Sequence, residues 1–313
     1  MDRQARIFVA GHRGLAGSAI LRRLQAAGHD RLVTRSRAEL DLTDAVAVDR
    51  FFAAEKPDYV FLAAAKVGGI HANSTYGGDF IRDNLLIQDA VINAAHRHGV
   101  AKLMFLGSSC IYPRLAPQPM KESDFMSGPL EPTNRPYAVA KIAGIELCRA
   151  LRLQYGFDAI SLMPTNLYGP GDNFDLENAH VLPALIHRFH NAKTAGDAEV
   201  TVWGSGKPRR EFMHVDDLAD AAYFLMQHYD EPDIINVGVG EDVSIGELAE
   251  LVKQAVGFQG RLVLDSSKPD GMPRKLLDVS RLTALGWSPK TSLEDGIAGT
   301  YRWFLDNLGR IRR

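Results

Sequence analysis

The chain has 313 residues, of which 46% are hydrophobic and 24% are charged, and its formal net charge is −2 at pH 7. This composition is typical of a globular protein, and so small a net charge gives no reason to expect nucleic acid or an anionic membrane as a partner. No apolar run approaches the roughly 18 residues of a membrane-spanning helix, and we expect no secretory signal, because the N-terminus leads directly into an apolar strand. The two cysteines, Cys110 and Cys148, indicate a reducing cytoplasm rather than a disulfide scaffold.

The first half of the sequence alternates apolar runs with helical patterns. Strands are predicted at residues 6–10, 32–34, 59–63, 103–106 and 159–163, with helices up to residue 25 and at 46–54, 80–98 and 142–155. Uninterrupted apolar strands separated by helices predict a parallel sheet that is covered on both faces. The expected fold is therefore a doubly wound, Rossmann-type α/β domain.

After Pro164 the alternation loosens and turn sequences multiply, at residues 168–172, 203–206 and 270–273. Shorter strands are predicted at 200–203, 234–237 and 262–264, and helices at 217–227, 245–256 and 293–307. We therefore expect a first domain over residues 1–165 and a smaller α/β lobe over 166–313, with some later segments returning to the first domain.

Glycines recur at every third position where the first strand meets the first helix. This G-x-x-G-x-x-G spacing suits a tight turn, a close backbone approach and a helix N-terminus aimed at an anion, as a dinucleotide pyrophosphate requires. The alternative, a glycine-rich turn without a ligand, is disfavoured because the turn lies between a strand and a helix. The candidate cofactor residues of this turn are Gly11, His12, Arg13, Gly14, Leu15, Ala16 and Gly17.

The end of the second strand indicates which dinucleotide binds. An NAD site usually places an acidic residue there for the ribose hydroxyl, whereas this chain reads Thr34-Arg-Ser-Arg37. Arg37 and Arg13 suit a 2′-phosphate instead, so NADP is the predicted cofactor, although either arginine alone is more often a solvated surface residue. Asp41 and Leu42 are predicted to flank the adenine.

Tyr137 and Lys141 are separated by four residues, which places them on one face of a helix. The ammonium then lies beneath the phenol and is expected to lower the pKa of the phenol, which suits it to proton exchange with a carbonyl or an alcohol. The alternative is a surface tyrosine packed on a lysine stem. Ser108 and Ser109 follow the fourth strand, at the sheet edge where α/β proteins bind ligands.

The glycine turn, Ser108 and the Tyr137–Lys141 pair together resemble the extended short-chain dehydrogenase/reductase family, whose members act largely on nucleotide-diphosphate sugars. The stretches at 10–14, 63–69, 107–113, 131–134, 163–170 and 267–271 extend the resemblance over almost the whole chain. They are similar to the branch of the family that acts on GDP-4-keto-6-deoxy-D-mannose. This resemblance implies NADPH-dependent 3,5-epimerisation and 4-reduction of that sugar to GDP-L-fucose.

A ketone at C4 acidifies the C–H bonds at both C3 and C5, so one base and one acid can invert both centres. The resemblance assigns Cys110 as the base and His180 as the acid. A nearby positive charge would favour the thiolate form of Cys110. Taken singly, Cys110 reads as a small buried hydrophobe and His180 as a surface histidine. In the reduction Tyr137 protonates the C4 oxygen, which Ser108 orients, while Lys141 also binds the nicotinamide ribose.

The resemblance also implies the remaining contacts. Further cofactor contacts are expected from Leu106, Gly107, Ser108, Ser109, Tyr137, Lys141, Pro164, Thr165, Asn166, Leu167 and His180. Substrate contacts are expected from Ser109, Cys110, Asn166, Arg188, Trp203, Arg210 and Asp270. No metal is expected. A homodimer is expected through the helices at 80–98 and 142–155, unless their apolar faces only cover the sheet. Without the resemblance, Trp203 reads as lobe core and the two arginines as surface charge.

Three other functions compete with this interpretation. A 4,6-dehydratase normally has an acidic pair beside the serine, where this chain has Ser109 and Cys110. A 4-epimerase recycles bound NAD, which the two arginines at the second strand disfavour. A nucleotide-sensing protein that lost catalysis should lack part of the Ser–Tyr–Lys set, which is complete here.

Overall fold

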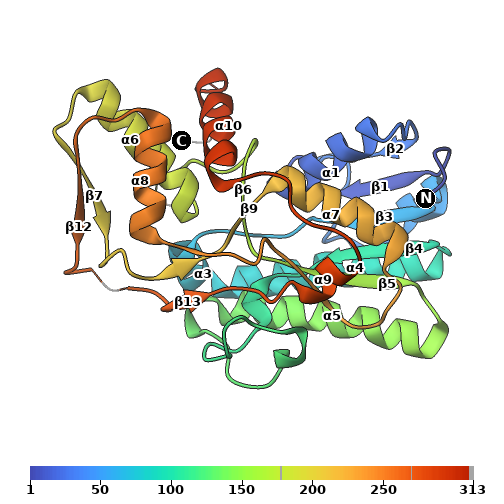
Figure 1. Cartoon of the computed structure of the whole chain (residues 1–313). Helices are drawn as coiled ribbons and strands as arrows, with labels where there is room; N and C mark the ends of the chain where they lie inside the picture. Colours follow the sequence, from blue (N-terminus) through green and yellow to red (C-terminus); the bar gives the residue numbers. More distant parts are fainter. Residues whose placement is uncertain (177, 269, 310–313) are drawn as a thin grey trace.

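A computed structural model describes residues 1–176, 178–268 and 270–309, and at its centre lies a six-stranded parallel sheet (Figure 1). The strand order is β10-β5-β4-β3-β1-β2. These strands are β1 (Ile7–Ala10), β2 (Leu32–Val33), β3 (Tyr59–Leu62), β4 (Lys102–Leu106), β5 (Ala159–Pro164) and β10 (Ile235–Val237). Because β1 pairs with both β2 and β3, the strand order reverses there, and the carboxyl ends of β1 and β3 mark the point where such sheets bind ligands.

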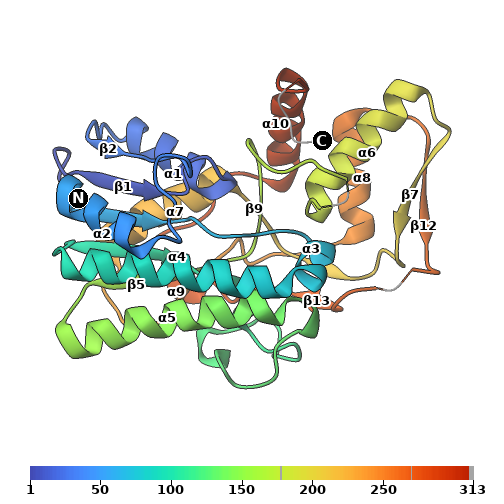
Figure 2. The same ribbon diagram turned by 180° about the vertical axis from the view of Figure 1, so that it is seen from behind.

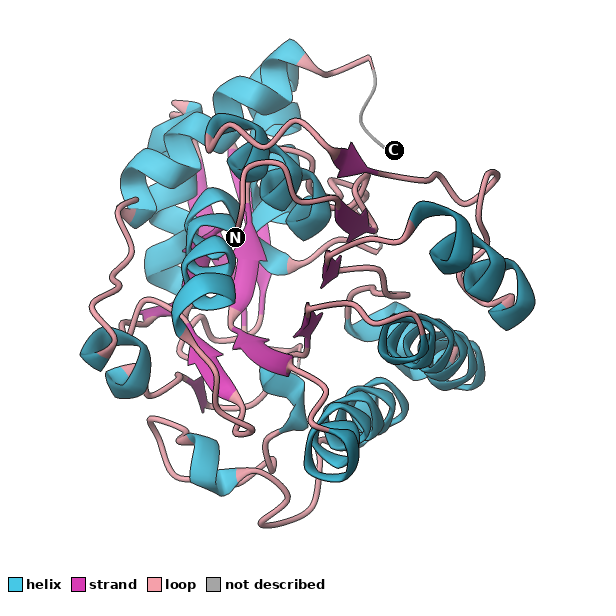
Figure 3. Cartoon of the chain, turned by 90° about the vertical axis from the view of Figure 1, so that its right-hand side faces the viewer, coloured by secondary structure: helices cyan, strands magenta, loops and turns pink. Residues whose placement is uncertain are grey.

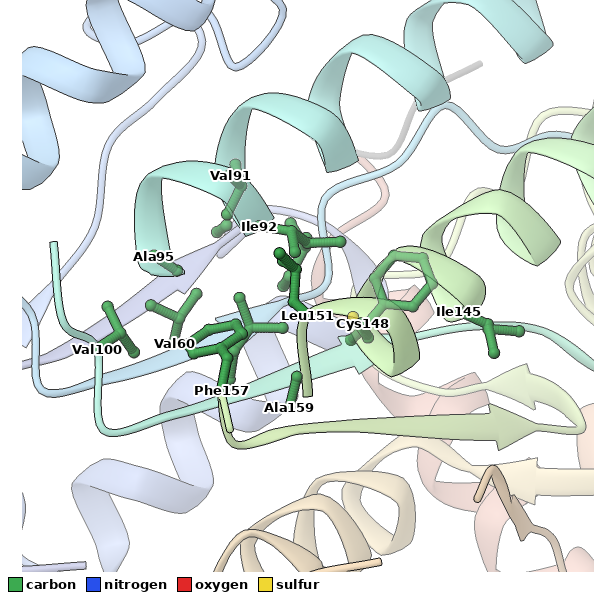
Figure 4. Close-up of a cluster of buried hydrophobic side chains, with 14 of the residues drawn as sticks. Val60, Val91, Ile92, Ala95, Val100, Ile145, Cys148, Leu151, Phe157 and Ala159 are labelled. Carbon is green, nitrogen blue, oxygen red and sulfur yellow. The ribbon is translucent and has the colours of Figure 1, made fainter. Parts of the chain in front are cut away.

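Helices cover both faces of the sheet, as the view in Figure 3 shows. They are α1 (Leu15–Ala26) and α7 (Val215–His228) on one face, and α2 (Ala45–Glu55), α4 (Gly77–Arg97) and α5 (Arg135–Tyr155) on the other. Side chains alternate along β1, so that Ile7 and Val9 join one core and Phe8 joins the other. The core beneath α4 and α5 includes Cys148 (Figure 4). The predicted fold class is confirmed.

The second lobe has its own core, built from α6 (Val181–Ala195), α8 (Ile245–Val256), α10 (Leu293–Asp306) and the strand pair β7–β12 (Figure 1). The strands outside the main sheet are β6 (Asn166–Tyr168), β7 (Glu199–Trp203), β8 (Arg209–Arg210), β9 (Phe212–His214), β11 (Val243–Ser244), β12 (Arg261–Asp265) and β13 (Arg274–Lys275). The short helices are α3 (Ile70–Thr75), α9 (Ser280–Ala284), η1 (Ser109–Ile111), η2 (Glu122–Asp124) and η3 (Pro132–Asn134). Past residue 165 the chain thus contributes to this lobe and, through α7 and β10, to the parallel sheet.

Besides the short helices α3 and α9, which were not predicted, two longer helices differ from the sequence-based expectation. Helix α5 begins at Arg135 rather than at residue 142, because Pro136 stands in its first turn, where a missing N–H costs nothing. Tyr137 and Lys141 therefore lie near its beginning. Helix α6 was not among the predicted elements, since Pro183 interrupts its pattern; that proline also falls in a first turn.

Within the described part of the chain, no helix combines the length and the apolar character needed to cross a membrane.

Candidate active site

The glycine turn after β1 has no room for other side chains. Gly11 adopts a φ of +87°, and a Cβ on it would lie 2.7 Å from the backbone nitrogen of Ala64. A Cβ on Gly17 would lie 2.1 Å from the carbonyl oxygen of Gly11. Helix α1 begins after Gly14 without a side-chain cap, so its first-turn N–H groups are free of side-chain acceptors. Such a turn fits the pyrophosphate of a dinucleotide.

His12 supports the same fit. Its Nδ1 atom is buried and has no hydrogen-bond partner within the described chain. Burial, followed by the charge of Arg13, lowers the pKa of the imidazole, so His12 is neutral at pH 7. A bound cofactor would supply the partner that the chain does not.

Two arginines follow β2, and they differ in what their side chains contact. Arg35 is engaged, because its guanidinium lies 2.5 Å from a carboxylate oxygen of Glu55. Arg37 is 80% exposed, and its Nε lies 3.4 Å from the Asp41 carboxylate, a weak surface pair that leaves it available to an anion. The nearby Glu39 is turned towards Ser36, whose N–H and hydroxyl both donate to it at 2.7 Å.

The other predicted cofactor contacts at this end are Arg13, which is exposed, and Leu42, which packs on the sheet core.

Lys141 and Tyr137 lie together on α5, but they interact differently from the sequence-based expectation. Lys141 is 3% exposed, and its Nζ donates to the carbonyl oxygen of Leu106 at 2.7 Å. The same Nζ lies 5.9 Å from the centroid of the Tyr137 ring. Burial lowers the pKa of Lys141 to about 7, so only part of the population carries a protonated, charged lysine at neutral pH.

The expectation that Lys141 lowers the pKa of Tyr137 is wrong in this structure. Burial raises the pKa of the phenol, the charge of Cys110 raises it further, and only a side-chain hydrogen bond with Ser108 opposes them. Burial prevails because a phenolate loses more solvation than the Ser108 hydroxyl restores. Tyr137 is therefore a protonated phenol at neutral pH, which is the form that a proton donor needs.

Cys110 lies in the turn after β4, next to Ser108. Its backbone N–H donates to Ser108 Oγ at 3.2 Å, which fixes the turn. Its Sγ accepts hydrogen bonds from Asn134 Nδ2 at 3.2 Å and from Lys275 Nζ at 3.5 Å. Ser109, which lies between Ser108 and Cys110 in the sequence, is 4% exposed. The thiol thus faces a cation that comes from β13, a distant segment.

His180 stands at the N-terminus of α6, where its side chain caps no backbone group. His180 is an exposed residue as a whole, but burial by the protein around its imidazole lowers the pKa of that group, and the charge of Lys275 lowers it further. Lys275 therefore lies within electrostatic reach of both His180 and Cys110. The loop before His180 is held by a backbone bond of 3.1 Å from Gly69 N to Asn178 O.

Sequence reasoning missed Lys275 and Asn134. Asn134 closes a stretch that had been recognised, at 131–134, and its proximity to Tyr137 was the available signal. Nothing in the spacing of Lys275 marks it, because only the pairing of β13 with β8 brings it to the site.

Trp203 on β7 is 64% exposed, which excludes the alternative that it is lobe core. Val200 and Val202 of the same strand point inward, so the strand alternation turns Trp203 outward. Two cations lie over its ring, with Arg188 Cζ at 5.7 Å and Lys268 Nζ at 5.5 Å from the centroid. An exposed aromatic ring with two cations suits a nucleobase beside a phosphate.

The other predicted substrate residues have contacts of their own. Arg210 donates to the carbonyl oxygens of Arg209 at 2.7 Å and Met272 at 2.6 Å, and burial lowers the pKa of its guanidinium. Asp270 accepts from the backbone and the hydroxyl of Ser205 at 2.9 and 2.6 Å, so in this structure it fixes the turn after Trp203.

The remaining predicted residues surround the ends of β4 and β5. Asn166 Nδ2 donates to the carbonyl oxygen of Glu211 at 2.8 Å, and Thr165 N donates to that of Val237 at 3.0 Å. Gly107 packs against Met163, whose Cε would lie 2.4 Å from an added Cβ. Pro164 ends β5, and Leu167 lies on β6. Pro269, within the stretch at 267–271, lies outside the described residues.

Comparisons with known proteins point in one direction. The model of a family described as "NAD dependent epimerase/dehydratase family" matches residues 7–238. A relative from Oryza sativa subsp. japonica, named probable GDP-L-fucose synthase 1, is 63% identical over 308 residues, which cover 98% of this chain and 94% of that protein. The GDP-L-fucose synthase of Escherichia coli (strain K12) is 56% identical over 316 residues, covering 98% of each. The crystal structure of a GDP-L-fucose synthetase from Naegleria fowleri bound to NADP superposes with a TM-score of 0.94 at 32% identity, covering 100% of this chain and 96% of that chain.

Proposed function

Because the chain belongs to the NAD dependent epimerase/dehydratase family, we propose that it converts GDP-4-keto-6-deoxy-D-mannose to GDP-L-fucose by 3,5-epimerisation and NADPH-dependent 4-reduction. The observation that carries this proposal is the proximity of two sets of groups. We call Ser108, Tyr137 and Lys141 the reducing set, and Cys110, His180 and Lys275 the epimerising set. The two sets are close enough that the charge of Cys110 raises the pKa of the Tyr137 phenol.

NADP fits the residues present, with the glycine turn for its pyrophosphate and Arg13 and Arg37 for its 2′-phosphate. When bound, NADPH supplies the hydride for C4. The chain's own part in reduction is to protonate the C4 oxygen from Tyr137, while the Ser108 hydroxyl holds that oxygen. Lys141, anchored on Leu106, lies where it can bind the nicotinamide ribose.

Epimerisation comes before reduction, because only the ketone acidifies C3 and C5. The Cys110 thiolate removes a proton from the carbon next to the carbonyl, and His180 returns a proton to the other face of the sugar. Lys275 supports the thiolate by donating to its sulfur. An imidazolium with a depressed pKa is a stronger acid than an ordinary histidine, which suits this proton return.

We assign the nucleotide to the lobe formed mainly by residues 166–313. Trp203 offers a face for the guanine or ribose, and Arg188 and Arg210 offer positive charge for the diphosphate. Asp270 contributes by holding the turn that carries Trp203.

One incubation tests the proposal and its rivals. The purified protein is mixed with GDP-4-keto-6-deoxy-D-mannose and NADPH in deuterated water, and NADPH absorbance and the proton NMR spectrum of the product are followed. We expect NADPH consumption and a product that carries deuterium at both C3 and C5. Consumption of NADPH without deuterium at either carbon would reduce the function to a plain 4-reductase, and no consumption would reject the reaction.

We also propose a homodimer formed by α4 and α5 of two copies. These helices lie side by side on one face (Figure 2) and leave Leu85, Leu86, Val139 and Leu153 exposed. Exposed apolar side chains on two neighbouring helices favour a partner surface of the same kind. Light scattering should give twice the chain mass at micromolar concentration and the single-chain mass for Leu86→Glu; a wild-type monomer would contradict the dimer.

We further propose a cytoplasmic location, which is supported by two cysteines that are both free thiols. Fractionation of producing cells with an antibody against the chain tests this proposal.

A further inference from the structure

Glu211 is a fully buried carboxylate between two strands that carry site residues. Its side chain is 0% exposed, and it stands between β8, which ends at Arg210, and β9. One carboxylate oxygen accepts the N–H groups of Val239 at 2.6 Å and Gly240 at 2.8 Å. The other accepts the N–H of Leu277 at 3.1 Å. One side chain thus joins three segments that are far apart in the sequence.

The main chain of Glu211 is tied to the site as well. Its carbonyl oxygen accepts Asn166 Nδ2 at 2.8 Å, and its N–H donates to the carbonyl oxygen of Lys275 at 3.4 Å. The pairing of β8 with β13 sets Arg210 opposite Lys275. Glu211 is therefore bonded to, or adjacent to, three residues of the proposed site, of which one contacts the thiol of Cys110.

The cradle around the carboxylate is specific for an acid. Its two oxygens accept three backbone amides, and the side chain of Thr165 also hydrogen-bonds the carboxyl group. A glutamine amide nitrogen, which donates, would face at least one of these backbone amides. A Cβ on Gly238 would lie 2.3 Å from a carboxylate oxygen, so glycine is needed there to admit the group. Burying a charge without a cation is costly, and only full satisfaction by such donors offsets the cost.

We propose that Glu211 is a positioning residue of the active site, which holds Lys275 against the Cys110 thiol and Arg210 at the diphosphate. Its carboxylate fixes residue 277, two positions after Lys275, and the turn at 239–240, while its main chain connects β8 to Asn166 and Lys275. The reaction that this site would perform rests on the proposed function. The hydrogen bonds of Glu211 are independent of it.

The test uses two readouts that need no turnover. The first is the rate at which iodoacetamide labels Cys110 in the folded protein; Cys148 is 1% exposed and packed in the core (Figure 4), so it stays unlabelled. The second is the affinity for GDP, measured by calorimetry. In Glu211→Gln we expect both to fall by about tenfold, since the thiolate is the reactive form and Lys275 supports it. NADPH affinity should fall less than GDP affinity, because the glycine turn and Arg37, which are proposed to hold the cofactor phosphates, are not among the residues bonded to Glu211.

The matched control is Glu241→Gln, the same chemical change at an exposed glutamate beside the same turn, which should behave as the wild type. Gly238→Ala would place a Cβ 2.3 Å from a carboxylate oxygen of Glu211, so it should displace the group and reproduce both losses. A folded Glu211→Gln protein with wild-type labelling and GDP affinity would overturn the proposal. If neither variant yields folded protein, Glu211 serves the fold alone, which overturns it equally.

Deuterium exchange by the wild-type protein separates this inference from the proposed function. Absence of exchange in the wild type would reject the proposed reaction, while the labelling and GDP results would still decide the role of Glu211.

Discussion

The reducing set and the epimerising set are neighbours in space but are built in different ways. Ser108, Tyr137 and Lys141 come from the end of β4 and the beginning of α5, two adjacent elements of the sheet domain. The epimerising set joins Cys110 to Lys275, a pair separated by 165 positions in the sequence, and to His180 at the start of α6. The first set depends on local spacing, and the second depends on how the lobes pack.

The two sets also differ in what tunes them. Burial dominates the reducing set, because it lowers the pKa of Lys141 to about 7 and raises the pKa of Tyr137. In the epimerising set burial is also the largest cause of the lowered pKa of His180, but a particular neighbour adds to it. Lys275 lowers that pKa further through its charge and also donates to the Cys110 sulfur. Variants should therefore separate the two chemistries even though Cys110 and Tyr137 interact.

Tyr137→Phe is expected to give the largest difference between the rates of reduction and epimerisation. Removing the phenol hydroxyl removes the proton donor, so reduction should fall by about 10³-fold, within the range typical of general acid catalysis. Deuterium exchange at C3 and C5 should persist. NADPH oxidation and the NMR spectrum of the keto sugar measure the two rates on one sample. An unchanged reduction rate would remove Tyr137 from the mechanism.

Cys110→Ser should give the converse result. A hydroxyl is a far weaker base than a thiolate, so exchange at C3 and C5 should fall by about 10²-fold or more. Reduction should continue and yield a product whose C3 and C5 are not inverted, which NMR identifies. Full exchange in this variant would show that another group is the base.

Lys141→Met tests through protein stability whether burial sets the pKa of Lys141. The pKa of Lys141 is about 7 in the folded protein, against about 10.4 for an unfolded lysine, so between these values the unfolded chain binds more protons. The free energy of unfolding of the wild type should therefore rise with pH across this window, and the cost of the buried ammonium is fully present below pH 7.

In Lys141→Met that rise should vanish, and the protein should be more stable than the wild type by about 2 kcal/mol at pH 6. Urea unfolding of both proteins from pH 6 to pH 9.5 measures the difference. Parallel curves would show that burial does not tune this lysine.

The smallest effect is expected from Arg37→Ala, which lies in the proposed cofactor site outside both sets. Loss of one exposed guanidinium should lower kcat/KM for NADPH by about tenfold and leave that for NADH unchanged, because only NADPH carries the 2′-phosphate. Arg31→Ala, at another exposed arginine near the same strand, is the matched control. Equal kcat/KM for the two cofactors in the wild type would contradict the preference for NADPH.

The sequence alone determined the parallel sheet, the glycine turn and the Tyr137–Lys141 pair. These depend on uninterrupted apolar strands, on the helical period of 3.6 residues and on which residues fit a tight turn, all of which are local features of the sequence. Only the tertiary structure brought Lys275 to Cys110 and joined the Glu211 carboxylate to two distant segments, at residues 239–240 and 277. It also reversed the expected shift in the pKa of Tyr137, because the burial of the phenol is set by packing and no spacing rule encodes it.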